Sequence, residues 1–161
     1  MVVVADTSVL LNLCRVQLED LLPQLFGEVW IPPMVEHEFK QLAGVSPRFT
    51  GLVLPAWVKL SSPPTIPPMV TACANLDPGE TEALALAMKL RADYILVDDH
   101  AARVAARQLQ QRSTGIGGIL LLAKAAGLIA TVRPNLDRLQ REARFFLSPA
   151  VVRELLRLAG E

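Results

Sequence analysis

A short run of β-branched residues that ends in an acid opens the chain and limits what it can fold into. Residues 2–4 are all valine, the pattern of a buried strand, and Asp6 falls where that strand is expected to end. The hydroxyls of Thr7 and Ser8 follow, placed to cap a helix over residues 9–13 and to hold the turn around the Asp6 carboxylate. Open α/β sheets bind ligands at the carboxyl ends of their strands, so Asp6 marks the edge where a site is expected.

Strand and helix patterns alternate along the rest of the chain. Further strands are predicted at residues 28–31, 57–60, 94–97 and 112–114. Further helices are predicted at residues 18–26, 33–42, 68–74, 78–92, 101–110, 119–126, 131–144 and 148–158. The segment YILV at 94–97 is apolar throughout, which is typical of a parallel strand buried on both faces. The alternation predicts a parallel α/β sandwich with right-handed crossovers.

Length and hydropathy indicate one domain. The 161 residues are 52% hydrophobic, enough for a sizeable core. We expect a single domain over 1–161, with 43–78 as a loop-rich, proline-containing excursion and 131–161 as a C-terminal helical extension. No apolar run approaches the ~20 residues that cross a bilayer, and the N-terminus lacks the basic region of a secretion signal. The expectation is a cytoplasmic protein without a membrane partner.

The charges are balanced in total but not along the chain. Up to His100 there are six basic and twelve acidic residues, and after it there are ten basic and four acidic residues. An acidic cluster beside a basic surface suits a metal-dependent enzyme acting on a phosphodiester. The uneven distribution of charge also has a simpler explanation, in which the charged residues only cover solvent-exposed helix faces and have no functional role.

Several carboxylates are expected at one edge of the sheet. Asp6 follows the first strand, Glu38 lies on the helix at 33–42, Glu80 lies near the start of a later helix, and Asp98 and Asp99 follow the strand at 94–97. Carboxylates that share a pocket repel one another unless they share a proton or bind a hard cation. The grouping therefore predicts a Mg²⁺ or Mn²⁺ site. Each acid alone has a simpler explanation, as a helix cap, an exposed helix residue or a partner of the helix dipole.

Ordered motifs along the chain resemble those of the PIN-domain nucleases, to which the VapC-type toxins of toxin–antitoxin pairs belong. The motifs are VVVADTSVLLNL, then IPPMVEHEF, then LDPGETEALALAMKLRADYILVDDHAAR. The later segments TGIGGILLLAKAAGLI and SPAVVRELLRLAGE resemble a predicted-nuclease subfamily long catalogued as a domain of unknown function. The resemblance implies a PIN-like three-layer α/β/α sandwich around a mostly parallel sheet, with extra C-terminal helices.

The resemblance also implies roles for single residues. It makes Asp6, Glu38, Glu80 and Asp99 the catalytic and metal-binding acids, with Asp98 alongside Asp99 as a further metal ligand. Thr7 or Ser8 would support the site through a hydroxyl. Glu80 departs from the toxin relatives, which often have Asp at this place, and its longer side chain changes the spacing of the ligands.

The function predicted from these features is metal-dependent hydrolysis of RNA by an endoribonuclease. Arg103, Arg107 and Arg112 follow the acidic edge and are candidate contacts to the RNA backbone, the alternative being an ordinary helix surface. The resemblance implies the toxin of a two-component module, restrained by a small antitoxin protein. The apolar C-terminal helices also offer a homodimer surface.

Two other functions fit parts of the sequence. One is a non-catalytic PIN-fold module that binds RNA or a protein. The other is a phosphoryl-transfer enzyme with Asp6 as the nucleophile, which the sequence argues against because Ser8 stands where such enzymes carry a second Asp.

Overall fold

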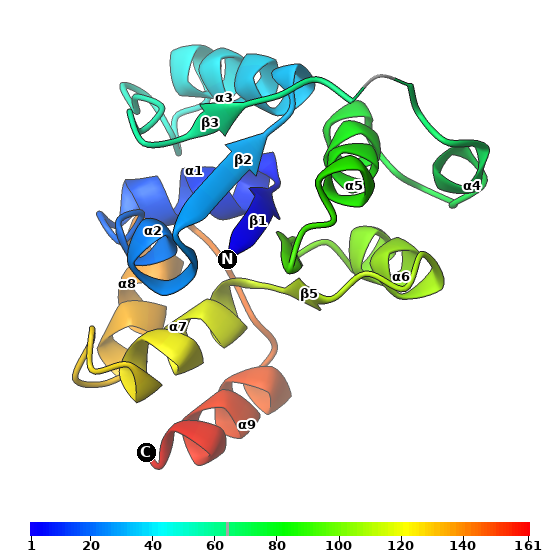
Figure 1. The fold of residues 1–161 in the computed structure, drawn as a ribbon. Helices are drawn as coiled ribbons and strands as arrows, with labels where there is room; N and C mark the ends of the chain where they lie inside the picture. The colour runs from blue at the N-terminus through cyan, green and yellow to red at the C-terminus, as the bar shows by residue number, and fades with distance from the viewer. Residues whose placement is uncertain (64) are drawn as a thin grey trace.

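A five-stranded parallel sheet forms the centre of the molecule (Figure 1). The computed structural model describes residues 1–63 and 65–161. The strands are β1 (Val2–Ala5), β2 (Glu28–Ile31), β3 (Lys59–Leu60), β4 (Tyr94–Leu96) and β5 (Ser113–Thr114), in the spatial order β3-β2-β1-β4-β5. Every neighbouring pair is parallel, as the alternation of strands and helices predicts.

Helices connect the strands and cover the sheet. They are α1 (Thr7–Arg15), α2 (Leu21–Phe26), α3 (Pro33–Val45), α4 (Pro68–Thr71), α5 (Pro78–Leu90), α6 (His100–Gln108), α7 (Ile116–Ala125), α8 (Arg133–Glu142) and α9 (Pro149–Ala159). Among the helices, α1 contacts α3 and α8, and α5 contacts α3 and α4. The helix α7 contacts α2 and α9, and α6 contacts β5. The architecture is the predicted α/β/α sandwich with C-terminal helices.

Local signals explain where the main helices begin. Pro33 occupies the first turn of α3, where its missing N–H group costs no hydrogen bond. Asp77 and Glu80 form a reciprocal capping box at the start of α5. Ser148 caps α9 by accepting a hydrogen bond from the N–H of Val151. These boundaries agree with the sequence prediction.

The register of the central strands sets the position of the candidate site. Val4 lies beside Ile95, and Ala5 lies beside Leu96, so β1 and β4 end together. The N–H of Asp6 donates to the carbonyl of Leu96 at 3.0 Å. Val4 and Ala5 are fully buried, and this core holds the ends of β1 and β4 in register.

Several helix starts differ from the sequence prediction, among them that of α2, which begins at Leu21 instead of residue 18. The first helix begins at Thr7, and the hydroxyls of Thr7 and Ser8 do not cap it. The helix α7 begins at Ile116 and includes Gly117 and Gly118, which the sequence placed in a preceding loop. A Cβ at Gly117 would lie 2.8 Å from a methyl group of Leu155 on α9, so glycine here permits close helix packing.

The excursion between α3 and α5 packs on the sheet edge and the core. Lys59–Leu60 pair with the end of β2 as an edge strand, and Phe49 and Val70 are buried. Pro64, one of the prolines in this excursion, lies outside the described residues. In the part of the chain that the structure describes, no helix combines the length and apolarity that membrane crossing requires.

Candidate functional site

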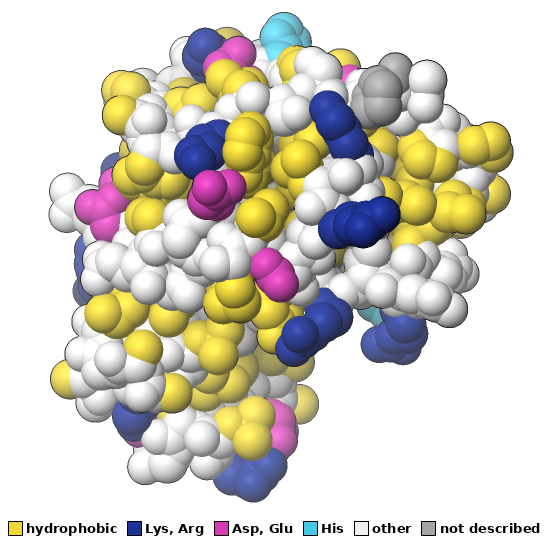
Figure 2. Space-filling model, in the orientation of Figure 1, with side chains coloured by type: hydrophobic (Ala, Val, Ile, Leu, Met, Phe, Trp, Pro, Cys, Tyr) yellow, Lys and Arg dark blue, Asp and Glu magenta, His cyan; other side chains and the backbone are white. Residues whose placement is uncertain are grey.

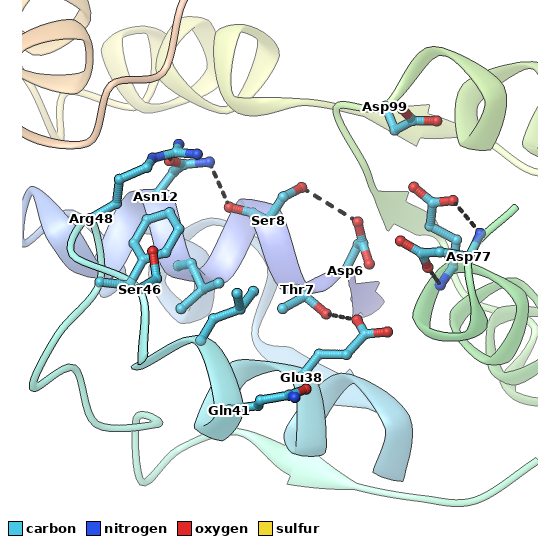
Figure 3. A pocket seen from close by; sticks show the side chains of 14 residues that line it. Asp6, Thr7, Ser8, Asn12, Glu38, Gln41, Ser46, Arg48, Asp77 and Asp99 are labelled. Atoms are coloured by element: carbon cyan, nitrogen blue, oxygen red, sulfur yellow. Dashed lines mark hydrogen bonds between the residues drawn. The ribbon is translucent and has the colours of Figure 1, made fainter. Parts of the chain in front are cut away.

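A pocket of about 490 Å³ lies at the carboxyl ends of β1 and β4 and is lined mainly by polar side chains (Figure 3). Its lining residues are Asp6, Thr7, Ser8, Leu11, Asn12, Glu38, Gln41, Leu42, Ser46, Arg48, Phe49, Asp77, Glu80 and Asp99. The structure thus brings together the four predicted catalytic acids and both predicted supporting hydroxyls. They come from β1, α1, α3, α5 and the start of α6.

Asp6 lies at the centre of this pocket and is only 4% exposed. The chain leaves β1 at Ala5 and enters α1 at Thr7, so the carboxylate sits between a strand end and a helix start. The hydroxyl of Ser8 points back to it and donates to Oδ2 at 3.4 Å (Figure 3). One helical turn thus fixes both the acid and its nearest hydroxyl.

Glu38 reaches the pocket from α3, and two other helices hold its carboxylate. The hydroxyl of Thr7 on α1 donates to Oε2 at 2.6 Å, and the N–H of Gly79 on α5 donates to Oε1 at 3.1 Å (Figure 3). Because both oxygens accept a hydrogen bond, the carboxylate is fixed in one position between α1, α3 and α5.

The other acids of the pocket also cap helices. The N–H of Glu80 donates to Asp77 Oδ1 at 2.7 Å, and the N–H of Asp77 donates to Glu80 Oε2 at 3.0 Å. Asp99 Oδ1 accepts from the N–H of Ala102 at 3.1 Å, which caps α6. Each carboxylate keeps further lone pairs for a ligand. These acids can therefore cap helices and bind a ligand in the pocket at the same time.

The carboxyls in the pocket disfavour one another's ionisation. Burial raises the pKa of Asp6 to about 7, and the charges of Glu80, Asp77 and Glu38 raise it as well. Burial also raises the pKa of Glu80 to about 7, with further contributions from the charges of Asp77, Asp99 and Glu38. Neither Asp6 nor Glu80 forms an ion pair with a basic side chain among the described residues.

The donor set fits a hydrated hard cation. Among the described residues, no three Asp, Glu, His or Cys side chains are grouped closely enough to enclose an ion by themselves. Mg²⁺ does not need such a cage, since one or two carboxylates, several waters and substrate phosphate oxygens suffice. All ligand atoms on the acidic side of the pocket are oxygens. A positive charge would favour the ionised carboxylates of Asp6 and Glu80, whose pKa values are raised by burial and, to a smaller extent, by the neighbouring acids.

Asp98 does not line this pocket, although the sequence prediction groups it with the metal ligands. Both of its carboxylate oxygens face the N–H of Ile116 at the start of α7, at 3.1 and 3.3 Å. Burial raises its pKa to about 6, which the hydrogen bond to Ile116 and the charge of Arg103 oppose. The two adjacent acids after β4 therefore serve different helices.

The predicted RNA-binding arginines gather at a different place. Arg103, Arg107 and Arg112 line a second hollow of about 630 Å³, together with His100. The guanidinium of Arg112 stacks 4.4 Å from the centre of the Tyr94 ring. On the face shown in Figure 2, Lys and Arg side chains lie over α5, near β5 and beside α6. Asp99, which lines the acidic pocket, directly precedes α6, and residues of α6 line the second hollow. The start of α6 therefore lies between the two hollows.

Two charged residues of the pocket were not predicted as part of it. The sequence prediction starts a helix at residue 78, directly after Asp77, and does not place Asp77 in the site. Arg48 lies in the irregular stretch after α3, where no periodicity assigns it a direction. A signal for Asp77 existed, because a capping box couples it to Glu80.

Comparison with known families supplies one match over nearly the full chain. A family model described as a PIN domain matches residues 2–161. A search of curated proteins found no match.

Proposed function

Because this chain belongs to the PIN-domain family, whose fold is of the nuclease type, we propose that it is a metal-dependent endoribonuclease. A hydrolase acting on nucleic acid is the general expectation for the family. The proposal narrows the substrate to RNA and the cleavage site to the acidic pocket. The choice of RNA rests on the resemblance of the motifs around Asp6, Glu38 and Glu80 to those of the VapC-type toxins.

The observation that carries the proposal is the convergence of uncompensated acids. Asp6, Glu38, Asp77, Glu80 and Asp99 come from separate elements to one pocket. Burial and mutual repulsion raise the pKa values of two of them to about 7. A purely structural set of helix caps has no reason to meet in a shared, half-buried cavity, whereas a cation site requires such a meeting.

Within this proposal each side chain has a definite task. One or two of the acids Asp6, Glu38, Glu80 and Asp99 would bind the cation directly and the others through its waters. Thr7 and Gly79 keep the Glu38 carboxylate in place. A bound divalent cation lowers the pKa of water and offsets the charge of the phosphate under attack. In the hydrolysis, the water oxygen forms the new bond to phosphorus, the bond to the leaving sugar oxygen breaks, and that oxygen takes up a proton.

The hollow beside α6 is the cationic surface that would bind the RNA backbone. Arg103, Arg107 and Arg112 contact RNA phosphates outside the cleavage site, where they contribute affinity without reading sequence. The protein acts as the toxin of a two-component module, and a small antitoxin restrains it by covering the acidic pocket. The support for this role is the motif resemblance.

The first experiment is cleavage of a mixed RNA pool in the presence of Mg²⁺ or Mn²⁺. We expect cleavage by the unmodified protein and at least a hundredfold lower rate for Asp6→Asn, because the substitution removes the charge of the central ligand. Chelation of the metal abolishes cleavage. Glu38→Gln also loses activity.

Glu36→Gln is the matched control, because Glu36 lies on the same helix, pairs with Lys40 and does not line the pocket. Its cleavage rate stays within about twofold of the unmodified protein. If the metal-loaded, partner-free protein binds RNA with no cleavage, the proposal fails and the non-catalytic binding module replaces it.

A further inference from the structure

The acidic pocket has a second end that carries a cation. In Figure 3, Arg48 and Asn12 lie at one end of the pocket, and Asp77 and Asp99 lie at the other, with Asp6 and Glu38 between. Arg48 is the only basic residue among the described residues that line the pocket. A pocket with acids at one end and one arginine at the other is suited to a ligand that carries more than one phosphate.

The guanidinium of Arg48 is held in place before any ligand binds. Its Nε donates to the carbonyl of Ala143 at 2.9 Å, and its Nη2 donates to Asn12 Oδ1 at 3.3 Å. The group also stacks on the Phe49 ring, with its central carbon 4.7 Å from the ring centre. These contacts fix the plane of the guanidinium, so less entropy is lost when its remaining N–H groups bind a ligand.

The charge of Arg48 is not neutralised by the described protein. No described Asp or Glu lies within 4.0 Å of its nitrogens, and its two hydrogen-bond acceptors are an uncharged amide and a carbonyl. The N–H groups not used in these two bonds make no hydrogen bond to the described residues. The side chain therefore offers both free donors and a free charge to an anion.

The two ends of the pocket are separated along α1. Asp6 precedes α1 and Asn12, which holds Arg48, lies on that helix six residues later. At 1.5 Å per residue this is roughly 9 Å along the helix axis. Leu11 and Leu42 line the same pocket and provide an apolar surface for the sugar or base that joins two phosphates.

We propose that Arg48 binds the phosphate next to the one that is cleaved, so that a single strand lies along the pocket from the acids to Arg48. This assignment rests on the proposed nuclease function and extends it. Arg48 is then a substrate-positioning residue, and the substrate class is a single-stranded nucleic acid with a phosphate adjacent to the scissile one. A duplex, whose phosphates are held at the rim of its grooves, fits this half-buried path less well.

The test combines removal of one phosphate charge with removal of the arginine. In an oligoribonucleotide that the protein cleaves at a known bond, the phosphate on either side of that bond is replaced by an uncharged methylphosphonate. We expect one of the two replacements to lower kcat/KM by about tenfold to a hundredfold for the unmodified protein, mainly through KM. With Arg48→Gln, the same replacement has no further effect.

Arg15→Gln is the matched structural control. Arg15 also donates its Nε to a carbonyl at the end of α8, that of Glu142 at 3.2 Å, but it does not line the pocket. This variant keeps the full sensitivity to the methylphosphonate. If Arg48→Gln and the unmodified protein respond equally to both replacements, Arg48 does not contact a phosphate and the inference is wrong.

A binding measurement separates this inference from the proposed function. The anisotropy of a labelled oligoribonucleotide is measured against salt with the Asp6→Asn protein and with the same protein carrying Arg48→Gln. Loss of one phosphate contact on a single strand reduces the slope of log K against log salt by about 0.7. An unchanged slope overturns the role of Arg48. A reduced slope supports phosphate binding by Arg48, and if the unmodified protein then fails to cleave RNA, only the proposed nuclease function is contradicted.

Discussion

The position of the Glu38 carboxylate depends on a residue that has no side chain. Gly79 lies in the first turn of α5, and its N–H donates to Glu38 Oε1 at 3.1 Å. A Cβ at this place would overlap with the carboxylate of Glu38. Since Gly79 has no positive φ, the need for glycine comes from this close approach and not from the backbone conformation.

We predict that Gly79→Ala lowers activity without unfolding the protein. The added methyl group displaces the end of the Glu38 side chain, which is flexible, and thereby breaks its hydrogen bonds to Thr7 and to the backbone of α5. The rate of RNA cleavage falls at least about tenfold, while the free energy of unfolding changes by less than about 1 kcal/mol. Cleavage kinetics and thermal unfolding measure the two effects.

Gly44→Ala provides the comparison for Gly79→Ala. Gly44 lies in α3, and a Cβ there would meet no atom within 4 Å. Alanine at this place leaves cleavage unchanged and stabilises the protein by about 0.5–1 kcal/mol. Full activity of Gly79→Ala would show that the site tolerates movement of Glu38.

At the scale of elements, two adjacent acids after β4 are assigned to different helices. Asp98 accepts from the N–H of Ile116 and so fixes the start of α7 against the end of the strand. Asp99 accepts from the N–H of Ala102, caps α6 and lines the pocket. The strand end therefore places one carboxylate against the start of α7 and the next one in the pocket.

Substitution of these two acids is predicted to separate stability from activity. Asp98→Ala removes the acceptor for Ile116 and lowers the free energy of unfolding by about 1 kcal/mol, with cleavage per folded molecule within about threefold of the unmodified protein. Asp99→Asn keeps a good helix cap and the fold but loses cleavage at least about a hundredfold. Denaturant unfolding and cleavage assays on both variants check this. The opposite pattern, with Asp98 essential, would return Asp98 to the metal ligands.

The sequence predicted the strand positions and helix starts that are determined by residues close together in the chain. The local signals are the strands that precede Asp6 and Asp98, the proline at the start of α3 and the starts of α5 and α9, and the structure agrees with them. The distinction between Asp98 and Asp99 is not local, because it depends on where Ile116 lies. The start of α7 was also missed, since glycines that serve helix packing look like a loop in the sequence.

Arg48 shows most clearly what the sequence could not supply. Its direction is set by the carbonyl of Ala143, a residue 95 positions away, and by Asn12 on another helix. The sequence instead pointed to the arginines after His100, because they follow the acidic strand end along the chain. They do form a hollow, but it is separate from the acidic pocket. Nearness in sequence thus identified a basic surface and missed the basic residue inside the pocket.

For the molecule as a whole, the pocket lowers the stability of the metal-free fold near neutral pH. The pKa of Asp6 is 3.8 in its ordinary state and about 7 in the folded protein, so the folded state binds a proton more tightly than the unfolded state. Stability is therefore greatest below the ordinary pKa and falls as the pH rises through about 7. Glu80, also raised to about 7, acts in the same direction. Glu161 acts oppositely below its ordinary pKa, since hydrogen bonds from Val132 and Lys124 lower its pKa to about 2.

We predict that the metal-free protein becomes less stable between about pH 5 and about pH 8, by on the order of 2–3 kcal/mol from Asp6 alone. This range lies above the titration of Glu161. Asp98, whose pKa burial raises to about 6, adds to the loss of stability in the lower part of the range. Asp6→Asn removes the contribution of Asp6 and leaves those of Glu80 and Asp98, so the pH dependence becomes weaker and the variant is more stable than the unmodified protein at the upper end of the range. Addition of Mg²⁺ stabilises the unmodified protein most at high pH, because deprotonated carboxylates bind the cation, and it has little effect on Asp6→Asn.

Urea unfolding across the pH range measures the free energy of unfolding of each variant with and without Mg²⁺. Asp137→Asn, on the exposed face of α8, is the control and keeps the pH dependence of the unmodified protein. A metal-free protein whose stability rises steadily from about pH 5 to about pH 8 would mean that Asp6 is ionised without difficulty in the fold, and the central argument for a cation in this pocket would be lost.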